Sequence, residues 1–209
     1  MTMQINPDSR VLQGLSTFLA FAGLNALFLL CCLPVVTIPA ATSALFRVTI
    51  RYADDELGRP FRDYFPAFAS GFLHATAVGF AFLLPAALLA FSAAFWFSAA
   101  TVVGAIAAAF AALAAVYAFV SFLCGMALVA QYRDTIRRTI RNALLLPAAE
   151  PVRTAGILII PVTAVCLAII FPPFIVLVLT IFCSAGAYLA AMLFRSIFAR
   201  RTNNSIGAT

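Results

Sequence analysis

The feature that most limits what this chain can fold into is a run from Gly71 to Ala130 that contains no Lys, Arg, Asp or Glu. As a helix that rises about 1.5 Å per residue, this run would extend about 90 Å, which is about three times the thickness of the bilayer hydrocarbon core. A soluble core cannot hide so much apolar surface. The run therefore predicts a membrane protein with at least two crossings in this region alone.

The amino-acid composition also indicates a membrane protein. Hydrophobic residues make up 65% and charged residues 10% of the 209 residues, whereas a soluble domain carries about 25% charged residues. Mean hydropathy is +1.08, and several apolar runs exceed the roughly 20 residues that cross a bilayer as a helix. We therefore predict an all-α, polytopic membrane helix bundle over residues 1–209, with about five transmembrane helices and short amphipathic interfacial helices.

The placement of the charges decides between two and three crossings in the long run. All 13 basic residues are arginines, and they lie in short segments that flank apolar runs. This is the pattern of topology signals and headgroup contacts, so no nucleic-acid partner is expected. Three crossings would put the arginine-rich segments around 47–62 and 133–153 on opposite sides, against the excess of arginine on the cytoplasmic side. We therefore predict two long spans at about 72–97 and 101–130, with a turn near Ser98 to Thr101.

Three further spans complete the predicted topology, at about 11–33, 155–171 and 174–194. The first is too long for the apolar region of a signal peptide. Pro172-Pro173 supplies a tight hairpin between the last two, because proline disrupts a helix interior. These five spans place the N-terminus outside the cell membrane and the C-terminus in the cytoplasm, and the tail at 202–209 is expected to be disordered.

Two segments between the spans are predicted to be cytoplasmic loops, at about 39–71 and 131–154. In the first, residues 39–56 have the spacing of an amphipathic helix that lies on the membrane surface, and Arg47 and Arg51 sit four apart on it. A short helix follows, which would show an aromatic stripe to the acyl boundary. The members of that stripe are Phe61, Phe65, Phe68 and Phe72. The second loop has the pattern of a basic interfacial helix.

The chain lacks the residue combinations of common catalytic and metal sites. Its five cysteines fall in apolar runs and are odd in number, so we expect free thiols and no disulfide framework. They are Cys31, Cys32, Cys124, Cys166 and Cys183. No metal-ligand spacing, no nucleophile with a base and no paired carboxylates occur, so neither an enzyme nor a cofactor is expected. The spans contain no ionisable group besides a marginal His74, which disfavours an ion-coupled pump.

Two segments carry a resemblance to a known family. The stretch from Asn25 to Leu45, NALFLLCCLPVVTIPAATSAL, and the RDYFPAF segment from Arg62 to Phe68 resemble the YesL-like family of bacterial integral membrane proteins. The size and the five-span layout are also similar to that family. The chain departs from it at Ile38, where members often carry glycine before the proline of the turn. The resemblance implies a bacterial cell membrane, a setting beside carbohydrate uptake genes and a carbohydrate ABC importer as a partner, but no mechanism.

The turn from Pro34 to Ser43 is the strongest candidate site. A helix that begins near Pro39 would offer free N–H groups and a positive dipole end beside Thr37, Thr42 and Ser43, which suits an anion or sugar hydroxyls. The alternative, which we favour, is a structural corner that turns the chain, with Thr37 as a helix cap.

A few other polar residues are candidates. Asn25 lies in the middle of a span and should hydrogen-bond a neighbouring helix, because an unpartnered amide there costs on the order of 1 to 3 kcal/mol. His74, the only histidine, is expected to be packed or at the surface, and the alternative is a proton relay or pH sensor. The arginines of the second loop set the topology or bind anionic lipid headgroups or an acidic partner. They are Arg133, Arg137, Arg138 and Arg141.

These features favour a non-enzymatic accessory protein that binds a membrane partner, and homo-oligomerisation stays open. The alternative is a small-solute transporter or channel whose path is lined by hydroxyl and amide side chains. The available groups are Asn25, Thr37, Ser92, Ser121, Thr163 and Ser184. Clustering of these groups around one cavity would favour transport, whereas dispersal beside an exposed apolar patch would favour a partner interface.

Overall fold

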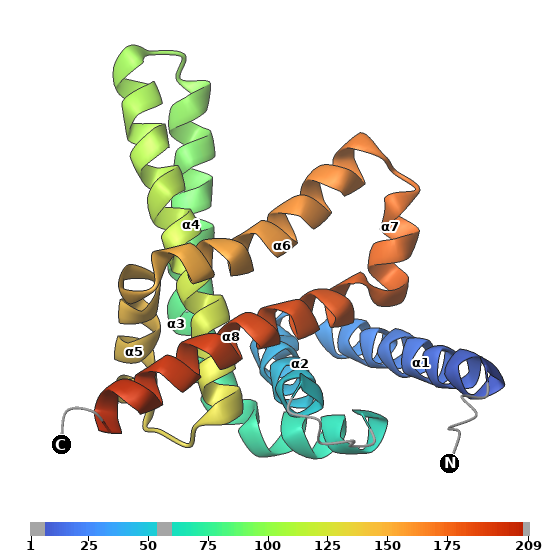
Figure 1. The fold of residues 1–209 in the computed structure, drawn as a ribbon. Coiled ribbons are helices and arrows are strands. Elements are labelled where there is room, and N and C mark those ends of the chain that lie inside the picture. Colours follow the sequence, from blue (N-terminus) through green and yellow to red (C-terminus); the bar gives the residue numbers. More distant parts are fainter. Residues whose placement is uncertain (1–6, 54–59, 207–209) are drawn as a thin grey trace.

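The computed structural model describes residues 7–53 and 60–206, and this part of the chain is helical apart from short turns (Figure 1). The prediction of an all-α polytopic protein is confirmed. The elements in chain order are α1 (Pro7–Cys32), the 3-10 helix η1 (Val35–Thr37), α2 (Ile38–Ala53), α3 (Pro60–Ser98), α4 (Val102–Gln131), α5 (Ile136–Ala149), α6 (Pro151–Ile170), α7 (Phe174–Leu177), the π-helix η2 (Val178–Phe182) and α8 (Cys183–Ile206).

Four helical segments in the described residues are long and apolar enough to cross a membrane. They are Arg62–Ser98, Val102–Gln131, Pro151–Ile170 and Phe174–Phe194, and a shorter apolar segment, Thr17–Cys32, belongs to α1. The chain is therefore a multi-pass membrane protein. Helices stand at each of the five predicted spans, while the side of the membrane on which each terminus lies stays a prediction.

Both predicted hairpin turns are present. α3 ends at Ser98 and α4 begins at Val102, and the Thr101 hydroxyl oxygen accepts a hydrogen bond from the Gly104 N–H at 3.0 Å, which caps α4. Between them Ala100 has a φ of 51°, the left-handed conformation of a tight turn. At the second turn, Pro172-Pro173 separates α6 from α7, and the Phe174 N–H donates to Phe171 O at 2.9 Å.

The prediction of a separate short helix before the second span is wrong. α3 runs unbroken from Pro60 to Ser98 with two prolines inside it, because spanning helices tolerate proline where neighbouring groups satisfy the freed backbone. Its aromatic stripe does not face the acyl boundary as a whole. Phe68 and Phe72 pack against the core and only Phe65 is exposed; the side chain of Phe61 lies outside the described residues.

The prediction that residues 39–56 lie on the membrane surface is also wrong for residues 39–53, and residues 54–56 lie outside the described part of the chain. α2 is buried on almost every side and contacts α1, α3, α4 and α8, and in Figure 1 α8 crosses in front of it. Small residues such as Ala41 and Ala44 let neighbouring helices approach closely. The hydroxyl of the buried Thr49 donates to Leu45 O at 2.9 Å, so it needs no water.

The helices do not run parallel to one another. In Figure 1 α3 and α4 stand upright as a hairpin, and α1, α6 and α8 lie across that direction. The outer half of the hairpin projects beyond the other helices. The start of α3, the α4–α5 connection and the C-terminal end of α8 lie at the opposite end of the molecule from the α3–α4 turn.

Candidate functional site

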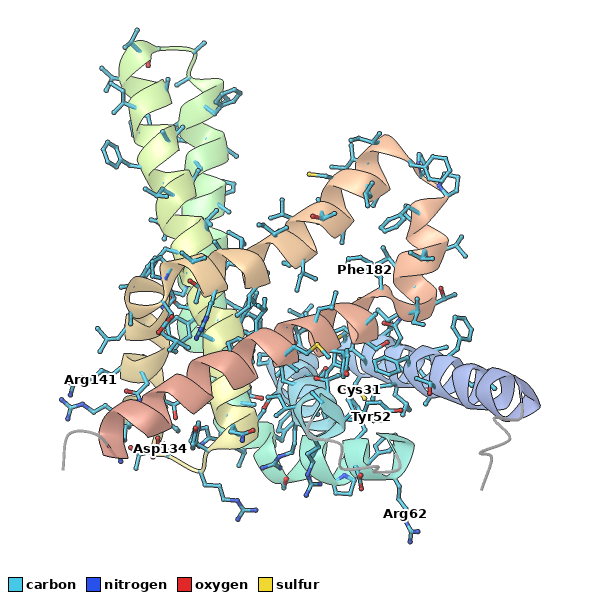
Figure 2. All side chains as sticks on the ribbon, in the orientation of Figure 1. Cys31, Tyr52, Arg62, Asp134, Arg141 and Phe182 are labelled. Atoms are coloured by element: carbon cyan, nitrogen blue, oxygen red, sulfur yellow. The ribbon has the colours of Figure 1, made fainter. Side chains whose placement is uncertain are left out.

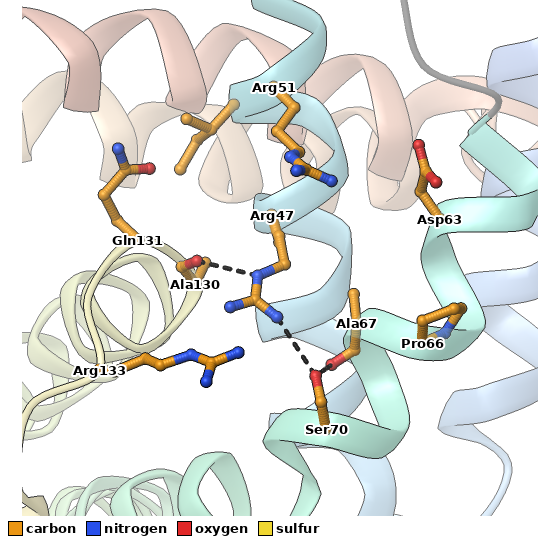
Figure 3. Close-up of a pocket in the computed structure, with 10 residues that line it drawn as sticks. Arg47, Arg51, Asp63, Pro66, Ala67, Ser70, Ala130, Gln131 and Arg133 are labelled. Carbon is orange, nitrogen blue, oxygen red and sulfur yellow. Dashed lines mark hydrogen bonds between the residues drawn. The ribbon is translucent and has the colours of Figure 1, made fainter. Parts of the chain in front are cut away.

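A polar pocket opens at the end of the molecule opposite the α3–α4 turn, between α2, the first part of α3 and the end of α4 (Figure 3). It consists of two adjoining cavities of about 530 and 350 Å³ that share Arg47, Ala67, Ser70 and Arg133. We call it the arginine pocket. Its remaining lining residues are Ser43, Ile50, Arg51, Asp63, Pro66, Gly71, His74, Val129, Ala130, Gln131, Tyr132 and Asp134.

Arg47 is the central cation of the arginine pocket. Its Nε donates to Ala130 O at 3.1 Å and its Nη1 donates to Ser70 Oγ at 3.3 Å, so the guanidinium is held between α3 and α4. Burial lowers the pKa of Arg47, and the nearby Arg133 and Arg51 guanidiniums lower it further. Because an arginine stays charged even after such a shift, the side chain remains a half-buried cation.

Positive charge outweighs negative charge on the pocket wall. Arg51 stands one helical turn beyond Arg47, and Arg133 reaches toward Arg47 from the α4–α5 connection (Figure 3). Of the two lining carboxylates, Asp134 already pairs with Arg138 at 3.6 Å. Among residues 17–53 and 62–194, whose side chains the structure describes, no carboxylate forms an ion pair with Arg47 or Arg133.

Some predicted site residues meet in this pocket and others do not. Ser43, His74 and Arg133 line it, and His74 Nε2 lies 3.5 Å from Thr139 Oγ1. The remaining predicted arginines do not line it: Arg137, Arg138 and Arg141 are exposed on α5, and Figure 2 shows Arg141 pointing away from the helices. Arg47, Arg51 and Ser70 were not predicted as site residues. The only signal for the first two was their spacing of four on one helix.

The predicted turn from Pro34 to Ser43 is a closed corner. The Thr37 hydroxyl donates to Cys31 O and Pro34 O, both at 2.5 Å, so it caps the end of α1 and not the start of α2. The backbone N–H of Ile38 donates to Val35 O, and the Thr42 hydroxyl donates to Ile38 O at 2.8 Å. These bonds use groups that the ligand hypothesis required to be free, and binding at this turn stays a prediction.

Pro39 packs into a notch on α3. It is buried, and a Cβ placed on Gly79 would collide with Pro39 Cβ and lie 2.6 Å from Pro39 Cγ. The same Cβ would lie 3.4 Å from the Phe122 ring. Glycine at this position therefore allows α2 to sit against α3 and α4.

Asn25 bridges α1 to the π-helical turn η2. It is fully buried, its Nδ2 donates to Leu179 O at 2.6 Å and Val178 O at 3.2 Å, and its Oδ1 accepts from the Ser184 N–H at 3.1 Å. A π turn shifts the helical hydrogen-bond ladder and leaves backbone groups that need other partners. Asn25 supplies them, and the Ser184 hydroxyl adds a bond to Phe21 O at 2.8 Å.

The five cysteines are free thiols. Cys31 and Cys32 are consecutive residues near the end of α1, and Cys31 packs against the hydrophobic core (Figure 2).

The fold and the pocket together define a multi-pass, all-α membrane protein with a basic pocket at one end. A family model described as a protein of unknown function, DUF624, matches residues 21–93, and the chain is similar to that family over this segment. The match covers the Pro34 to Ser43 corner, α2 and most of α3, and it contains the two stretches that resemble the YesL-like family. No curated protein and no solved structure matches the chain.

Proposed function

We propose that this protein is a non-enzymatic accessory protein of a bacterial cell membrane that binds another membrane protein through an apolar cleft. The observation that carries the proposal is a cleft of about 530 Å³ between the α3–α4 hairpin and α6, almost wholly lined by apolar groups. The lining residues are Leu83, Ala86, Ala87, Ala90, Ala115, Val116, Phe119, Leu158, Pro161, Val162, Val165 and Cys166.

The shape and lining of the cleft suit a helix of a partner. Ala86 and Ala90 lie four apart on α3, and Ala115 faces the same cleft from α4. In a membrane, helices associate through close packing at small residues, because lipid tails are as apolar as the helices themselves. A second apolar cavity of about 320 Å³ shares Phe119, Pro161 and Val165 with the cleft and extends its apolar wall toward α8.

The placement of the polar span residues supports binding over transport. Asn25 and Ser184 bond to backbone groups of α1 and η2, Thr37 closes the end of α1, and Thr163 is exposed on α6. These groups do not surround one cavity, whereas the cleft and the second cavity described above have mainly apolar walls. Dispersal of this kind favours a partner interface.

The resemblance to the YesL-like family supplies the partner class, a carbohydrate ABC importer. Site-specific photocrosslinking tests it in cells. The photoreactive residue p-benzoylphenylalanine at Ala87, inside the cleft, should crosslink to the membrane subunit of such an importer. The same residue at Leu88 is the matched control, because Leu88 is the next residue of α3, is 63% exposed and does not line the cleft.

The crosslinking results test the cleft and the partner class separately. A crosslink from Ala87 and not from Leu88 to an importer subunit would support both the cleft and the partner class. A crosslink to a different membrane protein would support the accessory role but contradict the importer as the partner. Equal crosslinking at both positions, or lipid adducts alone at Ala87, would contradict partner binding at the cleft.

We also propose that the end of the molecule with the arginine pocket faces the cytoplasm. The excess of arginine near the start of α3 and in α5 supports this orientation. A fluorescent reporter fused after Arg201 should be active inside the cell, and a periplasmic reporter inserted near Ala99 should be active outside. The reverse pattern would contradict the orientation.

A further inference from the structure

We propose that the arginine pocket binds a phosphate group, carried either by a free anion or by a lipid headgroup. This inference does not depend on the partner or the transport question, because it concerns the polar end of the molecule and not the apolar cleft. It rests on the convergence of Arg47, Arg51 and Arg133 from two distant segments on one cavity.

Two of these cations, Arg47 and Arg133, face one cavity without forming an ion pair with any carboxylate among residues 17–53 and 62–194. Arg47 is half-buried, and its burial, followed by the nearby Arg133 and Arg51 guanidiniums, lowers its pKa. Like charges at short range repel, more strongly where solvent is partly excluded. A bound anion would offset this repulsion, because each arginine would be attracted to it.

Arg47 is oriented for such a ligand before the ligand arrives. Ala130 O and Ser70 Oγ engage two of its five N–H donors, which fixes the plane of the guanidinium and leaves donors for the cavity. A guanidinium held in this way loses little conformational freedom on binding, and its fork matches two oxygens of a phosphate. Ser70, Gln131 and His74 add polar groups to the same wall.

The charge of the pocket favours phosphate over a single carboxylate. A phosphate monoester carries about −1.5 to −2 at neutral pH, which suits several cations around one cavity. Of the two acidic side chains, Asp134 pairs with Arg138 at 3.6 Å, and in Figure 3 Asp63 lies on the far side of Arg47 from Arg133. The cavities of about 530 and 350 Å³ can hold the group that bears the phosphate as well as the phosphate itself.

Isothermal titration with inorganic phosphate tests the free-anion form, using the full chain purified in non-ionic detergent and stripped of lipid. Arg133→Gln should weaken phosphate binding by about tenfold or more, since a charge-assisted hydrogen bond contributes about 1.5 to 3 kcal/mol. Arg141→Gln is the matched control, because it removes the same charge from an exposed residue outside the pocket. It should change the affinity less than about twofold. Arg133→Lys should fall between wild type and Arg133→Gln, because it keeps the charge and loses the fork.

A second arm distinguishes the lipid source. Nanodiscs that contain phosphatidic acid or only phosphatidylcholine are compared by native mass spectrometry of the released protein. A headgroup site predicts that wild type and Arg141→Gln retain phosphatidic acid and Arg133→Gln does not, with no binding of inorganic phosphate. A free-anion site predicts phosphate binding and no lipid preference. Thermal unfolding without ligand verifies that each variant is folded.

Absence of both phosphate and phosphatidic acid binding to folded wild-type protein would remove the site. Equal losses of binding in Arg133→Gln and Arg141→Gln would show that the ligand is attracted by the overall surface charge and is not bound in the arginine pocket.

Discussion

In a soluble protein, helices with polar side chains are exposed and apolar helices are buried. Helix α2 and the outer half of the α3–α4 hairpin show the opposite pattern. α2 carries two arginines and several hydroxyl residues, yet most of its side chains are buried. The hairpin is almost purely apolar, yet Phe91, Phe97 and Phe110 are 73%, 78% and 70% exposed. In lipid, exposure of an apolar side chain costs little, so small and polar residues mark the contacts between helices. Burial in this protein therefore follows close packing and hydrogen bonding more than hydropathy.

The largest expected effect comes from truncating one phenylalanine in each region. Phe46 is 4% exposed on α2 and packs edge-on against Phe194 with ring centroids 5.6 Å apart. Phe46→Ala should destabilise the protein by about 3 to 5 kcal/mol, because it opens a cavity in the core. Phe110→Ala should cost less than about 0.5 kcal/mol. Unfolding by sodium dodecyl sulfate titration measures both changes in unfolding free energy. Equal losses of stability would contradict the contrast between the buried helix α2 and the exposed hairpin.

Closing the notch on α3 should have the next largest effect. Gly79→Ala places a Cβ against Pro39 and should cost about 1 to 3 kcal/mol by overpacking. Gly71→Ala is the control in the same helix, where a Cβ would meet nothing within 4 Å. It should be neutral or stabilise by up to about 1 kcal/mol through helix propensity. A thermal midpoint for Gly79→Ala at or above that of Gly71→Ala would refute the packing of α2 against α3.

Removing the bridge from α1 to η2 should have a moderate effect. Asn25→Leu leaves Leu179 O and the Ser184 N–H without their partner, and interhelical bonds in membranes contribute about 0.6 to 1.7 kcal/mol. Thr163→Val, at an exposed hydroxyl of α6, is the neutral control. Hydrogen exchange of the 178–184 backbone should rise only in Asn25→Leu. Unchanged protection there would mean that the π turn is stable without Asn25.

Replacing the two prolines of the corner by alanine should reduce stability to different extents, and the smaller loss is expected at Pro34. Pro34 is exposed and Pro39 is buried against Gly79. Pro34→Ala should change stability by less than about 0.5 kcal/mol, and Pro39→Ala should cost more because its side chain fills the notch. Thermal midpoints in detergent decide the order. A larger loss from Pro34→Ala would show that the break after α1 matters more than the packing of α2.

Several local features were predictable because they depend on neighbours in the chain. Pro172-Pro173 ends a helix whatever surrounds it, because proline lacks an N–H and fixes φ. The turn near Ser98 to Thr101 followed from the length of the charge-free run and the placement of arginines on either side. The need of Asn25 for a partner followed from the cost of an unpaired amide, although the identity of that partner did not.

The sequence by itself determined that the chain is helical, that it enters a membrane and where the two helical hairpins turn, because hydropathy, proline and charge act locally. Only the tertiary structure decided that α2 is buried, because an arginine spacing of four fits a surface helix and a central helix beside a polar pocket equally well. It likewise decided which arginines meet. Arg47 and Arg133 are far apart in the chain, and they come together because α3 and α4 form a hairpin and α2 packs against both near its base. A contact of that kind depends on how three helices pack together, so no pattern of neighbouring residues in the sequence predicts it.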